Sequence, residues 1–250
     1  MSILSNKELY YRYRKKYILE LNIYQHQIDK ASEKSQFKTN NSITDNKNNI
    51  YGILGEIVFG DLFKIPQSDR LSTKDYDLIF LGQKVDIKTK KTTVVPSPEY
   101  NFSIATTSLH QSCDAYVGMR ISEDMKKAYL LGYITKKDFM TGGVYGVKGD
   151  VEENSSNNFT YQADCMNIPI AKMSVIDVGI LDYLQYNYEI KDENDIYFST
   201  QWFEMEKSKY RILLNKMSNK VTVQNDKRIN KLDIFCSDAY TFSQTLKQII

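Results

Sequence analysis

Apolar positions repeat at helical spacing in four parts of the chain. Residues 5–35 contain neither Pro nor Gly, and one face of this segment carries Leu9, Tyr13, Tyr17 and Leu21. Such spacing is typical of an amphipathic helix. Similar patterns predict three more helices, at residues 49–63, 179–190 and 198–218.

Runs rich in β-branched and aromatic residues predict the strands. The first two runs are close enough to form a hairpin across a two-residue turn at Gly82-Gln83. The runs are residues 76–81, 84–90, 115–121 and 128–134. Strands of this kind among helices indicate a mixed α/β fold, with a central mixed sheet flanked by helices.

Changes in texture along the chain suggest three parts. Residues 1–48 combine a basic helix with a polar linker, residues 49–174 form the α/β core, and residues 175–250 form a mainly helical C-terminal elaboration. The chain has 250 residues, of which 42% are hydrophobic. That is enough to bury one good-sized core with an additional element.

Three charged residues interrupt the apolar hairpin. With a turn at Gly82-Gln83, Asp77 is expected to face Lys88, and Asp86 is expected to face Ile79. Because side chains alternate along a strand, Asp77, Asp86 and Lys88 then share one face of the hairpin. Buried charges are costly unless they are compensated, and a metal ion is one form of compensation.

The helix before the hairpin adds a third carboxylate. Glu56 lies just beside the apolar stripe of residues 49–63. Gly52 and Gly55 are unusual there, since each costs a helix about 1 kcal/mol relative to Ala. We expect the backbone at these glycines to be closely approached by a neighbour or a ligand.

This combination fits phosphodiester hydrolysis. Asp77, Asp86 and Glu56 would supply the hard oxygen ligands that Mg²⁺ prefers, and Mn²⁺ is expected to substitute. Lys88 would orient the attacking water or offset the developing negative charge. The catalytic set predicted from the sequence is therefore Glu56, Asp77, Asp86 and Lys88.

The order of these residues resembles the PD-(D/E)XK nuclease superfamily, in particular its phage and bacterial members. The matching pieces are Gly52-Ile-Leu-Gly55-Glu56, Asp75-Tyr-Asp77 and Val85-Asp86-Ile-Lys88-Thr89. The resemblance covers residues 49–140 and implies a restriction-endonuclease-like α-β-β-β-α-β core and a Mg²⁺-dependent endodeoxyribonuclease. It departs from the pattern in two ways: Tyr76 replaces the usual Pro, and the first core strand is not obvious.

Several alternatives stay open. Asp75 shares the strand parity of Asp77 and competes with it for the metal, although only Asp77 is expected to face Lys88. The substrate is equally open, as a restriction site, a branched junction or a free end. A catalytically inert DNA- or protein-binding module on the same fold is the main alternative function. A structural protein with an ordinary surface ion pair between Asp77 and Lys88 is another.

The overall charge gives little attraction for DNA. Lys and Arg number 33 against 31 Asp and Glu, for a net charge of +2, so a DNA-binding surface requires segregated charge. The N-terminal residues Arg12, Lys15 and Lys16 form one such region, for which a solvated helix face is an equal alternative. Lys90 and Lys91, at the end of the hairpin, form another, and edge-strand lysines that block aggregation are the equal alternative there. For Ser108 and Gln111 a position facing the site is an alternative, but we expect both, like His110, to be surface residues.

Cysteine and histidine content, short motifs and apolar runs indicate which cofactors and which cellular compartment to expect. The chain has three widely separated cysteines and two histidines, which argues against a disulfide framework or a zinc site. It has no P-loop, so no nucleotide cofactor is expected. It also has no long apolar run, which predicts a cytoplasmic protein without a membrane span. DNA and a second copy of the chain, in a homodimer, are the expected partners.

Overall fold

The computed structural model describes residues 18–37, 49–71, 73–152, 160–188, 190–192, 197–205, 208–215, 218, 220–227, 230–235 and 238–249. The chain divides into two compact units, Met1–Ile176 and Asp177–Ile250. The division falls close to the boundary expected after residue 174. Each unit is described by itself.

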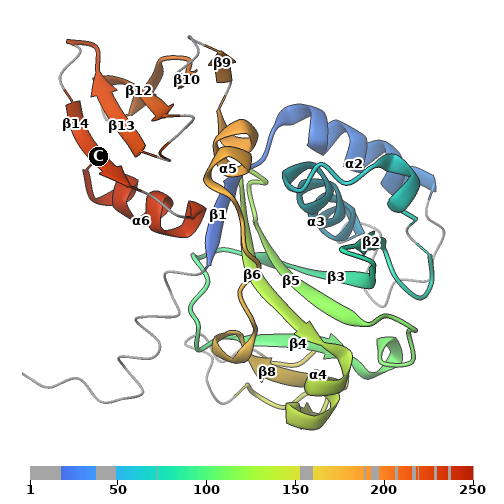
Figure 1. Cartoon of the computed structure of the whole chain (residues 1–250). Helices are drawn as coiled ribbons and strands as arrows, with labels where there is room; N and C mark the ends of the chain where they lie inside the picture. Colours follow the sequence, from blue (N-terminus) through green and yellow to red (C-terminus); the bar gives the residue numbers. More distant parts are fainter. Residues whose placement is uncertain are drawn as a thin grey trace, which may run out of the picture. The chain divides into compact units, whose positions relative to one another are not determined.

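A five-stranded mixed sheet forms the centre of the first unit, in agreement with the expected α/β class (Figure 1). Strands β3 and β5 pair in parallel, and the other neighbours pair antiparallel. In spatial order the strands are β1 (Leu19–Asn22), β6 (Lys127–Thr135), β5 (Ala115–Ser122), β3 (Gln83–Thr92) and β2 (Leu78–Phe80). The arrangement places β3 between β5 and a short edge strand.

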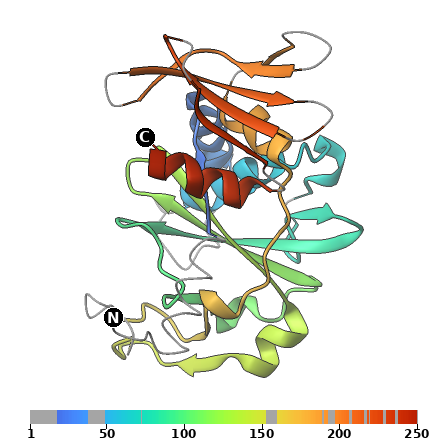
Figure 2. The same ribbon diagram turned by 60° about the vertical axis from the view of Figure 1, so that its left-hand side comes forward.

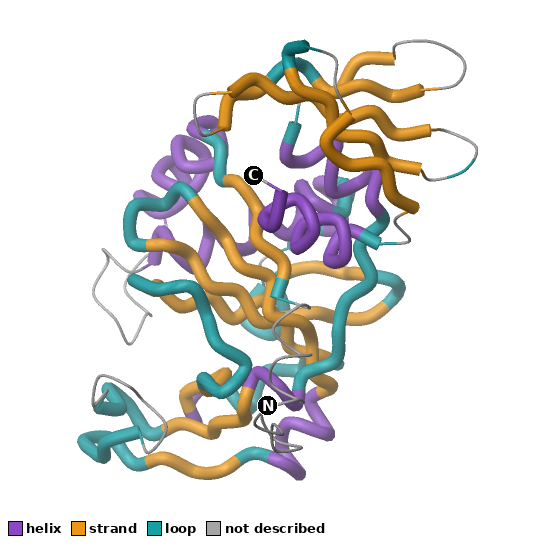
Figure 3. Tube along the Cα trace, turned by 90° about the vertical axis from the view of Figure 1, so that its left-hand side faces the viewer, coloured by secondary structure: helices purple, strands orange, loops and turns teal. Residues whose placement is uncertain are grey.

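Two packed helices, α2 (Gln25–Phe37) and α3 (Asn49–Leu62), lie over one face of this sheet (Figure 3). The predicted apolar stripe of α3 is buried, with Ile53, Leu54 and Val58 almost inaccessible to solvent. The apolar stripe thus faces the interior, as expected for a helix that covers a core.

Gly55 allows α3 to approach β3 closely. A Cβ atom at Gly55 would lie 2.0 Å from Thr89 Oγ1 and 3.0 Å from Thr89 Cβ. The expected close approach is therefore present at this glycine. At Gly52 an added Cβ would meet nothing within 4 Å, so packing does not explain that residue.

A small three-stranded sheet lies over the opposite face of the central sheet (Figure 3). An apolar core fills the space between the two sheets, and Phe139 packs edge-on against both Phe102 and Tyr116. The elements of this layer are β4 (Asn101–Ala105), β8 (Cys165–Pro169), β7 (Val144–Gly146) and helix α4 (Lys136–Gly142). Three short 3₁₀ turns connect parts of the unit, namely η2 (Gln67–Asp69), η3 (Thr106–Ser108) and η4 (Ile170–Lys172).

The long N-terminal helix expected over residues 5–35 is wrong over residues 19–22, which form β1. Leu19 and Leu21 are both buried while the residues after each are only half-buried. This two-residue alternation pairs β1 with β6, and tertiary pairing overrides the helical spacing. Helix α2 covers the expected range from Gln25 to residue 35, and residues 5–17 of that range lie outside the described residues. Arg12, Lys15 and Lys16 lie outside the described residues.

The second unit is built mainly of strands, so the mainly helical elaboration expected over residues 175–250 is wrong. One antiparallel sheet contains β9 (Ile190–Asp192), β10 (Tyr197–Thr200), β11 (Phe203–Met205), β12 (Ser208–Asn215), β13 (Lys220–Asn225) and β14 (Asn230–Phe235) (Figure 2). Its helices are α5 (Ile180–Asn187) and α6 (Ala239–Ile249).

The expected helix over residues 198–218 is replaced by β10, β11 and β12. Ile212 and Leu214 are buried two residues apart on β12, whereas Leu213 between them is half-buried. The apolar residues there follow the period of a strand, and cross-strand pairing with β13 stabilises it. Within the described ranges, no helix is long and apolar enough to cross a membrane.

Replacing Gly55 by Ala is expected to destabilise the protein by about 1–3 kcal/mol, the usual cost of overpacking. The new methyl group would collide with the Thr89 side chain and push α3 away from β3. Urea unfolding followed by circular dichroism measures the change.

Gly52→Ala is the matched control on the same helix. It meets open space, so better helix propensity should stabilise the protein by about 0.5–1 kcal/mol. Equal effects of the two substitutions would contradict the packing argument.

Candidate functional site

The β2–β3 hairpin turns one residue earlier than the sequence predicts. Leu81 and Gly82 occupy the turn, both with positive φ (50° and 77°), as a type I′ turn requires. Phe80 therefore pairs with Gln83 and Leu78 with Val85. This register brings Asp77 beside Asp86, so the predicted pairing of Asp77 with Lys88 is wrong.

The shared face survives this shift because the pairing moves by two positions. Asp86 and Lys88 stay two residues apart on β3, and the ion pair between Asp86 Oδ2 and Lys88 Nζ measures 2.6 Å. Asp86 is only 2% exposed. Its Oδ2 has no aligned hydrogen bond among the described residues, so the ammonium compensates its charge through proximity.

Asp77 closes the end of the β2–β3 ladder with its side chain. The backbone N–H of Ile87 donates to Asp77 Oδ2 at 2.7 Å, and the N–H of Asp77 donates to Val85 O at 3.0 Å. These two bonds hold the Asp77 carboxylate against the strand that carries Asp86 and Lys88.

The charges of two other carboxylates act on Asp77 at this end of β3. Burial raises the pKa of Asp77 well above its usual value, and the negative charges of Glu56 and Asp86 raise it further. The Ile87 N–H and the Lys88 ammonium act in the opposite direction on the pKa of Asp77. Glu56, on α3, lines a small pocket with Asp77, Lys34 and Arg70.

These oxygens are the donors available for a hard cation. Across the described part of the chain, no group of three or more His, Cys, Asp and Glu side chains is already arranged to hold a metal ion. The arrangement is instead two neighbouring aspartates, one of them paired with a lysine, and a glutamate on the adjoining helix.

Asp75, the competing aspartate, has a different partner. It is exposed, and its Oδ1 accepts a hydrogen bond from Ser112 N at 3.3 Å. Asp77 is the aspartate that contacts the backbone of β3.

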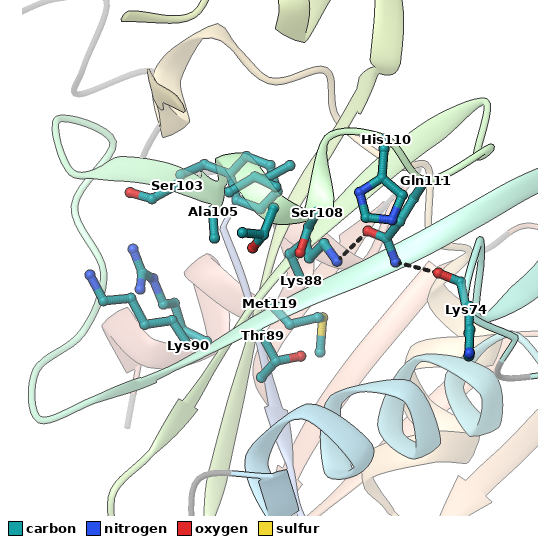
Figure 4. Close-up of a pocket in the computed structure, with 14 residues that line it drawn as sticks. Lys74, Lys88, Thr89, Lys90, Ser103, Ala105, Ser108, His110, Gln111 and Met119 are labelled. Atoms are coloured by element: carbon teal, nitrogen blue, oxygen red, sulfur yellow. Dashed lines mark hydrogen bonds between the residues drawn. The ribbon is translucent and has the colours of Figure 1, made fainter. Parts of the chain in front are cut away.

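Gln111 belongs to the site although the sequence suggested a surface role. Lys88 Nζ donates to Gln111 Oε1 at 2.8 Å, and Gln111 Nε2 donates to Lys74 O at 3.0 Å (Figure 4). Lys136 Nζ also donates to the Gln111 carbonyl oxygen. The glutamine is thus held on both sides and fixes the lysine. The long loop between β4 and β5 gives no sequence signal for this contact.

A basic cavity of about 670 Å³ opens beside Lys88, between β3–β5 and β4 (Figure 4). Lys90 lines it, whereas Lys91 is exposed and pairs with Glu123 at 2.7 Å. The two adjacent lysines predicted to bind DNA therefore have different surroundings. Other basic residues of the cavity are Lys74, His110 and Arg120.

Comparison with protein-family models, with curated proteins and with solved structures gave no match to this chain. The function is therefore inferred from the geometry of the site and from the residues that carry the family resemblance.

Replacing Asp77 by Asn is expected to stabilise the protein at neutral pH in EDTA. Because the pKa of Asp77 is raised in the folded state, its ionisation opposes folding by about 1.4 kcal/mol for each unit of elevation. This penalty is absent below pH 3.8, the ordinary pKa of an aspartate, and grows as the pH rises to the pKa of Asp77 in the folded protein. The gain in melting temperature should therefore increase as the pH rises.

Asp75→Asn is the control, since Asp75 is an exposed carboxylate two residues away. It should show no comparable gain at any pH. A loss of stability in Asp77→Asn throughout the pH range would contradict the like-charge argument, because Asn retains an oxygen that can accept from Ile87.

Proposed function

We propose that this protein is a Mg²⁺-dependent deoxyribonuclease with a PD-(D/E)XK active site. The observation that carries the proposal is the ion pair of buried Asp86 with half-buried Lys88 beside Asp77, whose pKa is raised by burial and then by Glu56 and Asp86. An ordinary surface ion pair needs only one carboxylate, so it does not account for the additional carboxylates of Asp77 and Glu56.

The donor set fits a hard divalent cation. Asp77 and Asp86 lie beside the Lys88 ammonium, and Glu56 acts on Asp77 from α3. Among the described residues, Asp86 Oδ2 is buried without an aligned hydrogen bond. Asp77 and Asp86 would hold Mg²⁺, which takes oxygen ligands and keeps several waters. Glu56 on α3, whose charge acts on Asp77, is the third oxygen donor that we assign to the ion.

The chain's own residues would divide the remaining work. The ion, when bound, would polarise the phosphodiester and favour ionisation of the attacking water. Lys88 would orient that water or stabilise negative charge on the phosphate oxygens. Gln111 would hold the Lys88 ammonium, and the basic cavity would receive the nucleic-acid strand.

The element order supports the restriction-endonuclease-like core in part. Helix α3, the hairpin β2–β3 and strand β5 occur in the order of the first helix, two of the strands and the last strand of the α-β-β-β-α-β pattern. The pattern departs after β3, where β4 pairs with β8 outside the central sheet and η3 stands in place of a helix. An inert binding module on the same fold would keep the basic cavity and lose the chemistry.

Purified protein should cleave linear, supercoiled or branched DNA with Mg²⁺ or Mn²⁺, and EDTA should abolish cleavage. Asp86→Asn and Lys88→Met should each lower the rate at least about 100-fold, as the loss of an acid–base or charge-stabilising group does. Gel assays over time measure the rates.

Asp75→Asn and Lys91→Met are the matched controls and should cleave as the wild type does. Wild-type protein that binds DNA but cleaves no substrate under these conditions would favour the inert module. Equal cleavage by Asp86→Asn and the wild type would refute the assigned site.

Gln111→Ala should lower the cleavage rate while DNA affinity in EDTA stays unchanged. A hydrogen bond to a charged group is worth about 1.5–3 kcal/mol, so the expected loss is roughly tenfold to a hundredfold. Single-turnover rates and fluorescence anisotropy provide the two readouts. A fall in affinity without a fall in rate would show that Gln111 acts on binding and not on Lys88.

A further inference from the structure

Arg120 is a buried cation without a carboxylate partner among the residues that the structure describes. It is 7% exposed, and Nη2 donates to Asn101 O at 2.7 Å. No carboxylate in the described part of the chain lies within ion-pair distance of its guanidinium group. Burial lowers the pKa of Arg120 to about 10, and the charge of Glu152 only partly opposes this.

Lys90 lies beside Arg120 and adds a second positive charge. The parallel register pairs the two residues directly across β3 and β5, so their side chains share one face of the sheet. Burial and then the charge of Arg120 lower the pKa of Lys90 to about 8, while Glu152 acts in the opposite direction. Two neighbouring cations on one face of a sheet, one of them buried and without a carboxylate at ion-pair distance among the described residues, indicate a site for an anion.

Both side chains line the cavity of about 670 Å³ that also contains Lys88 (Figure 4). Ser103 on β4 and Thr107 in η3 line it as well, which adds hydroxyl groups to the positive charges. The hydrogen bond from Arg120 to Asn101 uses one of the five N–H donors of a guanidinium group. Because a guanidinium group binds phosphate through paired donors, phosphate is the anion this chemistry suits best.

The spacing along β3 relates this site to the catalytic lysine. Lys88 and Lys90 are two residues apart on the same face, which corresponds to about 7 Å along a strand. A nucleic-acid strand carries a phosphate on every nucleotide, so one strand can present successive phosphates to successive positions on β3.

We propose that Lys90 and Arg120 form a phosphate-binding subsite, which holds the phosphate adjacent to the scissile one on a nucleic-acid strand. The proposal rests on nucleic acid being the substrate class. It adds Arg120 to the site and assigns Lys90, but not Lys91, to the substrate.

The test is a salt titration of binding to a fluorescein-labelled DNA duplex in EDTA, where cleavage does not interfere. Lys90→Met should weaken binding and lower the slope of log K against log salt by about 0.9, the value for one phosphate contact. Lys91→Met, the adjacent exposed lysine, should leave the slope unchanged. Arg120→Met should match Lys90→Met, and thermal unfolding identifies the case in which it fails to fold; Lys90→Met then decides alone.

Cleavage kinetics with Mg²⁺ separate this inference from the proposed nuclease. In an active enzyme, Lys90→Met should raise KM about tenfold and leave kcat within about twofold, since the lost contact is equally present in the ground state. Unchanged slope and KM in Lys90→Met would overturn the subsite while leaving the nuclease intact. A lowered slope in a protein that cleaves nothing would show that Lys90 contacts a DNA phosphate, but it would refute both the nuclease and the position of that phosphate next to a scissile one.

Inorganic phosphate is the remaining probe, because a free anion shares the chemistry of a backbone phosphate. If millimolar phosphate raised the melting temperature of the wild type but not of Lys90→Met, and the DNA slopes were equal, the site would bind free phosphate. That outcome would overturn the assignment to nucleic acid.

Discussion

Strand β3 carries charged side chains through the middle of a sheet that is covered on both faces, and the first unit is organised around this constraint. On one face, Ile87 and Thr89 pack toward α3. On the other face, Asp86 is shielded from water and half-buried Lys88 compensates its charge. Gln111 completes the hydrogen bonding of the lysine, and the carbonyl of Lys74 completes that of the glutamine.

The face of β3 that packs toward α3 depends on the close approach of that helix. Without a side chain at Gly55, the helix backbone comes near Thr89 and brings Glu56 to the end of the sheet where Asp77 lies. The chemical character of the site thus depends on a packing contact made by a residue with no functional group. The contact between Gly55 and Thr89 therefore affects both the packing of α3 on β3 and the position of Glu56.

The sequence predicts the elements of the site better than their pairing. The apolar stripe of α3 and the alternation along β3 follow from local periodicity, so the common face of Asp86 and Lys88 could be predicted. The hairpin register could not, because the turn places the non-glycine residue Leu81 at positive φ. Gln111 was missed for a different reason, since its contact with Lys88 is tertiary and leaves no pattern in the chain. In the second unit, the large apolar residues of β12 fit helical spacing as well as strand spacing, and only pairing with β13 decides between them.

Asp77 has two roles that place different demands on its side chain. As the acceptor for Ile87 N–H, it must present an oxygen at the length of an aspartate or asparagine. As a proposed metal ligand, it must also carry charge. A descendant of this protein that lost catalysis would therefore keep aspartate or acquire asparagine at position 77, while the residue at position 56 on α3 would be free to change. Among related proteins, the residues at positions 56 and 77 would therefore show whether selection still maintains catalysis or maintains only the hairpin.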